Sequence, residues 1–126
     1  MDEAVQISYN AIFPNQGQCC CAGSRTFVHA DIYDAFVQKA TELAVKRRVG
    51  NPFEDGVDQG PQVSEEQLNK VMDLVNSGIE EGASLKCGGK RWGSEGYFVE
   101  PTVFADVTDD MRIAKEEVKI ANNLRN

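Results

Sequence analysis

The 126-residue sequence lacks several features that would assign a protein to a class at once. No apolar run approaches the roughly 18 to 20 residues that span a bilayer. The chain begins MDEAVQIS, which is acidic where a secretory signal is basic and then apolar. These absences predict an intracellular protein without a membrane-spanning segment.

Histidine and separated cysteines are also scarce. His29 is the single histidine, and three of the four cysteines are consecutive, at 19–21. Neighbouring Cα atoms lie about 3.8 Å apart, closer than the roughly 4.4 to 6.8 Å of an ordinary disulfide, and only Cys87 stands apart. The sequence therefore predicts no disulfide framework. It predicts no metal site either, since no CxxC pair accompanies the single histidine.

Basic residues are outnumbered, with 13 Lys and Arg against 20 Asp and Glu and a net charge of −7. The basic cluster at 46–48 is only three residues long, whereas phosphate binding needs concentrated Lys and Arg. We therefore expect no nucleic-acid or membrane partner. The hydrophobic fraction of 41% is too high for general disorder, and the length suits a single domain.

Apolar periodicity predicts three helices. The first covers 2–13 and has acidic residues in its opening turn, which suits the helix dipole. The second begins at Asp31 as its cap, and the third begins with a capping box formed by Ser64 and Gln67. The second helix aligns Ile32, Phe36, Ala40 and Leu43, and the third aligns Leu68, Val71, Met72, Val75 and Ile79 and ends near Gly82.

Short apolar runs predict the strands. They lie at 26–28, 83–87, 97–99 and 102–104, and the run 111–114 also has the pattern of a strand. A Pro- and Gly-containing loop covers 50–63. Helices alternating with strands predict an α/β fold in which helices pack on a mainly parallel, incomplete sheet.

The cysteine triplet admits two interpretations. A buried cysteine behaves as a small hydrophobic residue, which is the better interpretation of Cys87. A thiol that follows a Gly-containing turn, with backbone N–H groups nearby, can instead be stabilised as a thiolate and exposed to a substrate. Spacing alone leaves both interpretations open for residues 19–21.

Four blocks of sequence carry a family resemblance. The run NQGQCCCAGSRTFV resembles the nucleophile segment of the aldehyde dehydrogenases. The blocks KRRVGNPFEDGVDQGPQVSEEQ, GYFVEPTVF and MRIAKEE resemble further segments of that family and occur in the family's order. The chain is identified as a member of this family, similar to its cytosolic and mitochondrial animal-type branch. The resemblance implies part of the family's catalytic domain.

The resemblance implies oxidation of a small-molecule aldehyde to a carboxylate with NAD or NADP. A cysteine thiolate attacks the aldehyde carbon, hydride passes to the nicotinamide, and water hydrolyses the resulting thioester. Cys20 matches the nucleophile by its place in GQxC, and its backbone N–H would help to hold the oxyanion. Cys19 and Cys21 match positions that border the substrate channel. Pro14 stands where the family often has an aromatic residue, which leaves the preferred aldehyde open.

The same resemblance implies three cofactor contacts. Gln67 and Lys70 match residues on the helix after the QGP loop, and Glu117 matches the second of two paired glutamates. Gln67 also serves in the capping box, and Lys70 has the alternative interpretation of a solvated surface lysine. These three residues would lie on the nicotinamide-ribose side of the cofactor.

The two ends of the chain depart from the family's pattern. Residues 1–5 resemble the interior of the family sequence, which implies that the dinucleotide-binding domain, the general-base glutamate and an oxyanion-binding asparagine lie outside this chain. Residues 118–126 resemble a later family segment. We therefore expect a partial catalytic domain over 1–117, followed at 118–126 by a remnant that an internal deletion has joined to it. Glu117 could belong to either segment.

Different classes of function follow from these observations. In the first, the chain is part of an NAD(P)+-dependent aldehyde dehydrogenase, whose family members are homo-oligomers, and it has little or no turnover when isolated. In the second, it is a non-enzymatic remnant that binds a full-length partner. A slow cysteine esterase is a third possibility. Either the cytoplasm or the mitochondrial matrix suits the family.

Overall fold

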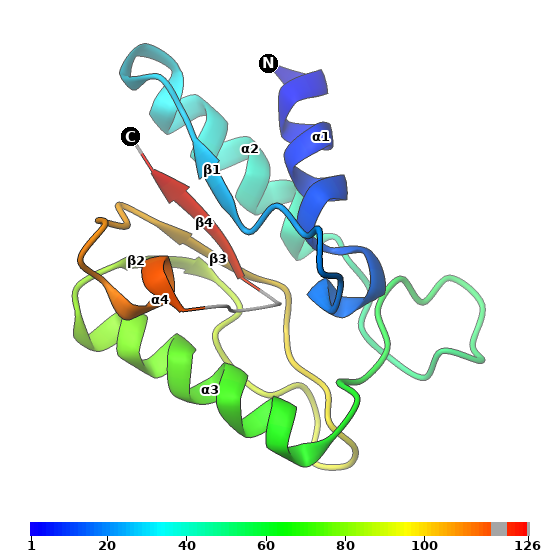
Figure 1. Ribbon diagram of the computed structural model, residues 1–126. Coiled ribbons are helices and arrows are strands. Elements are labelled where there is room, and N and C mark those ends of the chain that lie inside the picture. Colours follow the sequence, from blue (N-terminus) through cyan, green and yellow to red (C-terminus); the bar gives the residue numbers. More distant parts are fainter. Residues whose placement is uncertain (117–120, 126) are drawn as a thin grey trace.

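The protein folds around one mixed sheet, shown in a computed structural model that describes residues 1–116 and 121–125 (Figure 1). Within the second segment, Leu124 has the only described side chain. The strand order is β1-β4-β3-β2, with β4 parallel to both of its neighbours and β2 antiparallel to β3. The predicted mainly parallel sheet is confirmed. The strands are β1 (Arg25–Phe27), β2 (Ser84–Cys87), β3 (Thr102–Ala105) and β4 (Ala121–Arg125).

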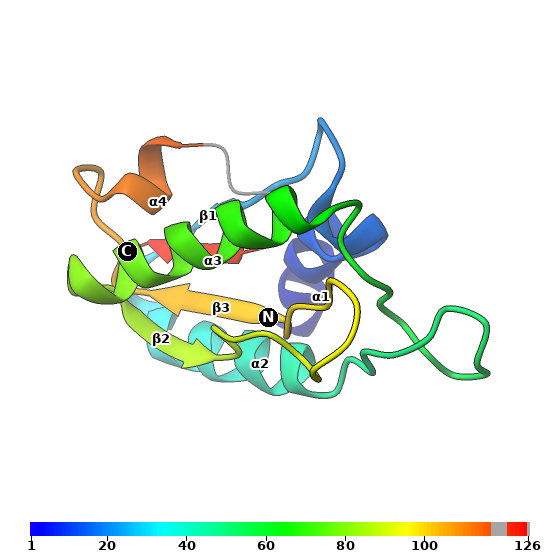
Figure 2. The same ribbon diagram turned by 90° about the horizontal axis from the view of Figure 1, so that it is seen from below.

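Helices cover both faces of this sheet. Figure 2 shows α2 and α3 on opposite sides of β3. Helix α1 shares a core cluster with α2, whereas α3 shares another with α4. The helices are α1 (Asp2–Ile12), α2 (Tyr33–Val45), α3 (Glu65–Glu80) and α4 (Arg112–Lys115), and the short 3-10 turns are η1 (Pro14–Gly17) and η2 (Ala30–Ile32). Among the described residues, no helix combines the length and the apolar character needed to cross a membrane.

Strand β3 joins the two cores. All of its residues are buried, as expected of a strand covered on both faces. Val103 and Ala105 belong to the cluster with α1 and α2, whereas Phe104 belongs to the cluster with α3. Successive side chains of a strand point to opposite faces, so this alternation follows directly from strand geometry. Burying a side chain such as that of Phe104 stabilises the fold by about 1.5–3 kcal/mol.

Helix α3 confirms the strongest helix prediction. The Ser64 hydroxyl accepts a 3.2 Å hydrogen bond from the Gln67 N–H, as the capping pattern predicted. Leu68, Val71 and Val75 are buried, but Ile79, which was expected in the same stripe, is 47% exposed. The buried stripe instead continues through Leu74 and Gly78, which face Phe104 and α4.

The start of α2 differs from the prediction. His29, rather than Asp31, caps the preceding turn, because its Nδ1 accepts a hydrogen bond from the Asp31 N–H at 3.2 Å. Ile32 is exposed, and Tyr33 takes the buried position. The Tyr33 hydroxyl donates to the Asp106 carboxylate at 3.0 Å and accepts from its backbone N–H at 2.7 Å. This pair holds the start of α2 against the end of β3.

Two predicted strands are wrong. At 97–99 the structure has only an isolated bridge between Arg91 and Val99, within a loop that contains left-handed glycines. The run 111–114 forms the turn of helix α4 instead of a strand. Met111, Ile113 and Ala114 are all buried, and a short apolar run of this kind does not distinguish a strand from a helical turn.

Residues 121–125 occupy the middle of the sheet. Arg25 pairs with Asn123 on one side of β4, and Phe104 pairs with Asn123 on the other. The Leu124 side chain is fully buried in the cluster with α1 and α2. The segment that the sequence sets apart as a remnant therefore contributes an internal strand.

Candidate active site

A left-handed turn leads from α1 into the cysteine triplet. Asn15, Gln16 and Gly17 have φ angles of +50°, +55° and +71°. Left-handed backbone is uncommon outside glycine, and such strain persists where surrounding contacts impose it. Here the Asn15 side-chain N–H donates to the Gln18 carbonyl at 2.9 Å, and the Gln18 N–H donates to the Asn15 carbonyl at 2.9 Å. This turn fixes the direction in which the cysteines leave α1.

The cysteines themselves form a tight turn. The Ala22 N–H donates to the Cys19 carbonyl at 3.1 Å, which places Cys20 and Cys21 at the tip, where both are exposed. The next residue returns to α1, because the Gly23 N–H donates to the Ala11 carbonyl at 2.9 Å. A Cβ at Gly23 would stand 3.0 Å from that of Ala11. The turn is thus anchored on both sides while the Cys20 side chain is accessible.

The two cysteines that flank Cys20 touch each other. Their sulfur atoms, in Cys19 and Cys21, lie 3.3 Å apart. The hydrogen bond with Cys19 raises the pKa of the Cys21 thiol, and the charges of Cys19 and Cys20 raise it further. The Cys21 thiol therefore ionises less readily than an ordinary cysteine thiol.

A polar pocket lies beside this segment. It has a volume of about 520 Å³ and is lined by Asn15, Gln16, Gln18, Pro61, Val63 and Gln67. The Gln18 side-chain oxygen accepts from the Val63 N–H at 3.1 Å, which connects the residue before the cysteines to the segment entering α3. The structure thus brings Gln67 to the same pocket as Gln18. The side-chain amides that line this pocket offer both hydrogen-bond donors and acceptors.

The other two predicted cofactor residues are placed differently. Lys70 is exposed one turn further along α3 and is not among the residues that line this pocket. The hydrogen bond from Arg112 lowers the pKa of Glu116 most, and the charge of Lys70 lowers it further. The charge of Lys70 thus acts on Glu116, which follows α4. Glu117 lies outside the described residues.

Arg47 connects the segments that position the cysteine turn, and the sequence did not single it out. Its guanidinium donates to the Tyr9 hydroxyl at 2.8 Å, to the Phe13 carbonyl at 2.9 Å and to the Asp58 carbonyl at 2.7 Å. It also lies over the rings of Tyr9 and Phe13. Arg47 thereby ties the end of α1, which leads to the cysteines, to the loop before α3. Nothing in the local sequence distinguishes it from its basic neighbours, Lys46 and Arg48.

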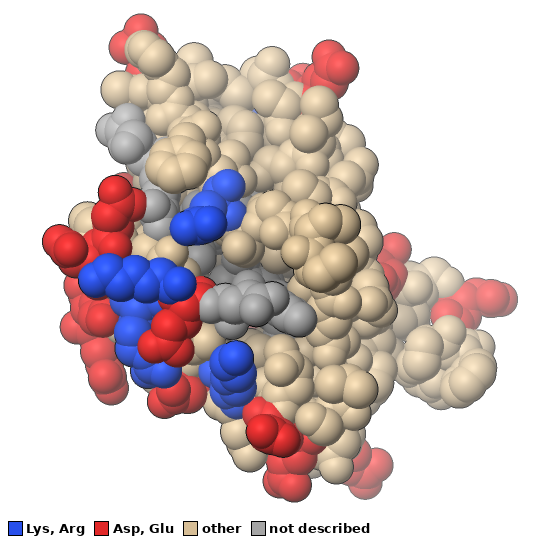
Figure 3. Space-filling view, in the orientation of Figure 1, with Lys and Arg blue, Asp and Glu red and all other residues tan. Residues whose placement is uncertain are grey.

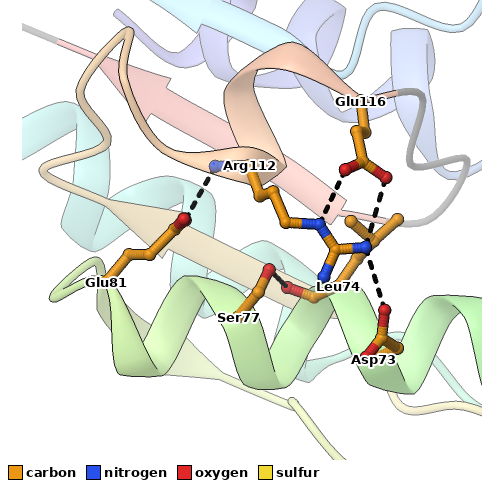
Figure 4. A network of polar contacts seen from close by, with 6 residues as sticks. All are labelled: Asp73, Leu74, Ser77, Glu81, Arg112 and Glu116. Carbon is orange, nitrogen blue, oxygen red and sulfur yellow. Dashed lines mark hydrogen bonds and ion pairs between the residues drawn. The ribbon is translucent and has the colours of Figure 1, made fainter.

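A second arginine network joins α3 to α4 (Figure 4). The Arg112 guanidinium donates to Glu116 at 2.7 and 3.2 Å and to Asp73 at 2.9 Å. These carboxylates raise the pKa of Arg112. The Arg112 backbone N–H also donates to Glu81 at 2.7 Å, so the network fixes both ends of the α3–α4 contact.

Charge is distributed unevenly over the surface. In Figure 3, charged side chains gather over α3 and α4, whereas the surface over α1 and the segment after it is mostly uncharged. A neutral substrate can approach such a surface without strong electrostatic selection. Within the described residues, no group of three or more His, Cys, Asp or Glu side chains is arranged to hold a metal ion.

The sequence is similar to those of known enzymes. The model of the aldehyde dehydrogenase family matches residues 1–119. An aldehyde dehydrogenase from Enchytraeus buchholzi is 60% identical over 118 residues, which cover 94% of this chain and 24% of that protein. A mitochondrial benzaldehyde dehydrogenase from Antirrhinum majus is 56% identical over 118 residues, covering 94% of this chain and 22% of that protein. The chain thus spans about a quarter of the length of these curated relatives.

Solved structures show the same similarity. An NAD+ complex of aldehyde dehydrogenase from Bacillus cereus matches with a TM-score of 0.94 and 40% identity, over 99% of this chain and 26% of that one. An aldehyde dehydrogenase variant from Pseudomonas syringae, in complex with NAD+ and octanal, matches with a TM-score of 0.94 and 34% identity, over 98% and 26%. The mixed fold described above is therefore a fragment of the fold of these proteins.

Proposed function

Because this chain belongs to the aldehyde dehydrogenase family, we propose that it supplies the nucleophile of an aldehyde-oxidising active site and that Cys20 is this nucleophile. One observation carries the proposal. Cys20 is exposed at the tip of a turn that is anchored on both sides, and it lies two residues after Gln18, which lines a polar pocket. An activated cysteine needs this combination of access and fixed position.

The Cys20 thiolate donates an electron pair to the aldehyde carbon, and the carbonyl π electrons move to oxygen. The Cys20 N–H can donate to this oxyanion, because the turn is closed by a different N–H, that of Ala22. Once the tetrahedral carbon has given up its hydride to an acceptor, Cys20 would hold the acyl group as a thioester until water releases the carboxylate and restores the thiol. Cys19 and Cys21 flank the reacting carbon and border the substrate.

The residues present fit the ribose end of a dinucleotide. Side-chain amides from Gln16, Gln18 and Gln67 line the pocket and match hydroxyl groups in hydrogen-bonding character. We assign Gln67 to this contact, together with Lys70 and Glu117 on the basis of the family motif. The oxidised nicotinamide of NAD or NADP, when bound, supplies the acceptor for the hydride. The phosphate and adenine contacts would come from residues outside this chain.

The division of the chain belongs to the same proposal. Residues 1–117 represent part of a catalytic domain, and 118–126 derive from a later segment of the family sequence. The protein would then function inside the cell, in the cytoplasm or the mitochondrial matrix, and one relative is described as mitochondrial. A small-molecule aldehyde would be its substrate. It would assemble into homo-oligomers, as members of the family do.

Two observations favour alternative activities of the isolated chain. The exposed Cys20 thiol suits slow ester hydrolysis, which requires a nucleophile but no cofactor. Strand β1 lies at one end of the described sheet and carries Phe27, which is 72% exposed, and an exposed apolar side chain at this position can contact another polypeptide such as a full-length relative. Both activities are compatible with little or no aldehyde oxidation by the isolated chain.

An acylation experiment tests the role of Cys20. We expect p-nitrophenyl acetate to release about one nitrophenolate per chain in a rapid phase, followed by slow hydrolysis. The Cys20→Ser variant should lose the rapid phase, and the matched Cys87→Ser variant should keep it. Equal acylation of wild type and Cys20→Ser would contradict the assignment.

A second assay addresses aldehyde oxidation. With an aldehyde and NAD+, the isolated chain should form NADH far more slowly than an intact enzyme of the family, because one missing oxyanion donor alone costs about 100- to 1,000-fold. A rate like that of an intact family enzyme would show that the 126 residues suffice for catalysis, and it would overturn the division proposed above.

A further inference from the structure

Arg47 joins two segments that lead to the cysteine turn. It contacts the end of α1 through Phe13, which caps the C-terminus of this helix and whose carbonyl accepts from Arg47 at 2.9 Å. Carbonyls at the end of a helix lack partners within the helix, and an arginine can satisfy them. Arg47 contacts the loop before α3 through the Asp58 carbonyl at 2.7 Å and the Gln59 side-chain oxygen at 3.0 Å.

Both segments continue to the cysteines. Residues 13–18 connect the cap of α1 directly to the cysteine triplet. The loop before α3 reaches the same place from the other side, since the Val63 N–H donates to the Gln18 side-chain oxygen at 3.1 Å. Gln18 is two residues before Cys20. The position of Cys20 therefore depends on two supports, and Arg47 holds both of them.

The backbone between these supports is in an unfavourable conformation. Asn15, Gln16 and Gly17 are consecutive residues with φ angles of +50°, +55° and +71°. Left-handed backbone of this kind is unfavourable for residues other than glycine, and it persists only where the surrounding structure imposes it. Such a turn relaxes when a support is removed, and the cysteines that follow it would then move.

We propose that Arg47 is a positioning residue for the reaction of Cys20, because it fixes the cysteine turn so that the thiolate and the Cys20 N–H face the same substrate carbonyl. This inference rests on the function proposed for Cys20. Arg47 does not touch the substrate, and its effect passes through Phe13 on one side and the loop 58–63 on the other. Displacement of a reacting group by about 1 Å can lower a rate by about 100-fold, so a residue several contacts away can control the reaction.

The contacts of Arg47 depend on the shape of a guanidinium. Its N–H donors lie in one plane at fixed angles, so one side chain can bind several acceptors at once. The acceptors are the Tyr9 hydroxyl, the Phe13 and Asp58 carbonyls and the Gln59 side-chain oxygen, none of which is charged. The guanidinium also lies 5.5 Å from the centre of the Tyr9 ring. A lysine would keep the charge but not this planar set of donors.

Positioning should affect two reactions of Cys20 differently. Acylation by an ester requires the thiolate and the oxyanion donor at fixed places around one carbonyl. Alkylation by iodoacetamide displaces iodide at carbon, and it requires an accessible thiolate but no oxyanion donor. The ratio of the two rate constants at Cys20 therefore reports position, whereas unfolding or a changed thiolate fraction alters both reactions.

These two rates, measured in the full chain with p-nitrophenyl acetate and iodoacetamide, test the proposal. We expect Arg47→Ala to lower the acylation rate constant by about 10- to 100-fold and to change the alkylation rate constant by less than about threefold. Alkylation of Cys20 is followed by fragmenting the tryptic peptide 1–25, since Arg25 is the first basic residue.

Arg48→Ala is the matched control. It removes the same charge from the next residue, whose exposed side chain lies beside Gly56. Both rate constants of Arg48→Ala should equal those of wild type. Acylation of Arg47→Ala as fast as that of Arg48→Ala would overturn the proposal, and so would equal losses in acylation and alkylation.

Two milder variants cover the case in which Arg47→Ala does not fold. Arg47→Lys should show the same fall in the ratio of acylation to alkylation, because the planar donors are lost. Tyr9→Phe removes one acceptor and keeps the ring, so it should show a smaller fall. Circular dichroism identifies the folded variants. The wild-type ratio in either folded variant would contradict a positioning role.

Amide hydrogen exchange examines the supports without any reaction. In Arg47→Ala or Arg47→Lys, the N–H groups of Gln18 and Val63 should exchange faster by a larger factor than that of Val71 in the middle of α3. Equal factors would mean a general loss of stability and would count against the proposal.

The role of Arg47 and the role of Cys20 can fail separately. If Cys20→Ser keeps the rapid acylation phase of wild type, the function proposed for Cys20 is wrong, whatever the exchange rates show. If Cys20→Ser loses this phase and the folded Arg47 variants keep it, only the positioning role of Arg47 is wrong.

Discussion

The Nε atom of Arg47 donates a 3.0 Å hydrogen bond to the side-chain oxygen of Gln59, which is itself only 2% exposed. The other end of the Gln59 amide donates to the Val99 carbonyl at 2.8 Å. The buried Gln59 side chain thus connects Arg47 to the loop that precedes β3. Both polar groups of this amide are satisfied, which burial requires.

Replacing Gln59 should therefore destabilise the protein. The Gln59→Ala variant leaves the buried Val99 carbonyl without this partner, and we expect a loss of about 1–3 kcal/mol in the free energy of unfolding. Urea denaturation followed by circular dichroism measures the change. The matched control is Gln38→Ala, which removes an exposed side-chain contact with Glu42 and should cost less than about 0.5 kcal/mol. Equal effects would show that the buried amide is not a structural connection.

Helix propensity alone predicts that Gly78→Ala stabilises the protein, but the packing around Gly78 predicts the opposite. A Cβ at this position would lie 2.9 Å from the Ile113 Cδ1 and 3.3 Å from the Phe104 ring. We expect Gly78→Ala to lower stability by about 1–3 kcal/mol despite the better helix propensity of alanine. Asn76→Ala, two residues earlier at an exposed position of α3, should be neutral or slightly stabilising. Stabilisation by Gly78→Ala in thermal unfolding would contradict the close packing of α3 on α4.

Cys87 should react slowly with alkylating agents. Burial raises the pKa of its thiol from the ordinary 9.0 to about 11, which reduces the thiolate fraction at pH 8 by about 100-fold. A variant with serine at 19, 20 and 21 leaves Cys87 as the single thiol, and its iodoacetamide rate can be followed by mass spectrometry. The rate should keep rising beyond pH 9. In urea it should become that of an ordinary thiol, and a fast reaction in the folded protein would contradict the buried position.

The α3–α4 contact should weaken in acid. The hydrogen bond from Arg112, with further charge interactions, lowers the pKa of Glu116 below its ordinary 4.5. A carboxylate with a lowered pKa contributes stability above its unfolded value and loses this contribution as the pH falls through the folded value. Glu116→Gln should therefore have a lower urea midpoint than wild type at pH 7, and the difference should vanish as the pH falls well below 4.5.

Salt provides the control for this prediction. Both partners are exposed, so high ionic strength at pH 7 should also shrink the difference between Glu116→Gln and wild type. A difference that is independent of both pH and salt would mean that the glutamate contributes through packing and not through its charge.

The sequence predicted those parts of the fold that depend on local patterns. Helices α1 and α3 and the cap formed by Ser64 and Gln67 were predictable, because each depends on the spacing of residues within one segment of the chain. The strand prediction at 111–114 was wrong because three buried apolar residues suit either a strand or a helical turn. Only packing against α3 decides between the two. The cap at His29 depends on the orientation of a ring nitrogen, which sequence does not reveal.

The candidate site was predictable in part. The cysteine triplet and its preceding Gly-containing turn stand out in the sequence. Gln67 lines the same pocket as Gln18, but its contact with a cofactor stays a prediction. The sulfur contact between Cys19 and Cys21 depends on how the turn is closed, and the role of Arg47 depends on Tyr9 and Asp58, which are distant in sequence. Such long-range partners become visible only in three dimensions.

The position of β4 has a consequence for the order of folding. Strand β4 lies between β1 and β3, and its Asn123 pairs with Arg25 of β1 and with Phe104 of β3. Neither β1 nor β3 therefore has its parallel neighbour until β4 is in place. During synthesis, β1 and one edge of β3 stay unpaired until residues 121–125 have left the ribosome. Pairing between such distant segments is slow, and exposed edges favour aggregation. We therefore expect the sheet to close in a late step, and cellular yield to depend on chaperones that cover these edges in the meantime.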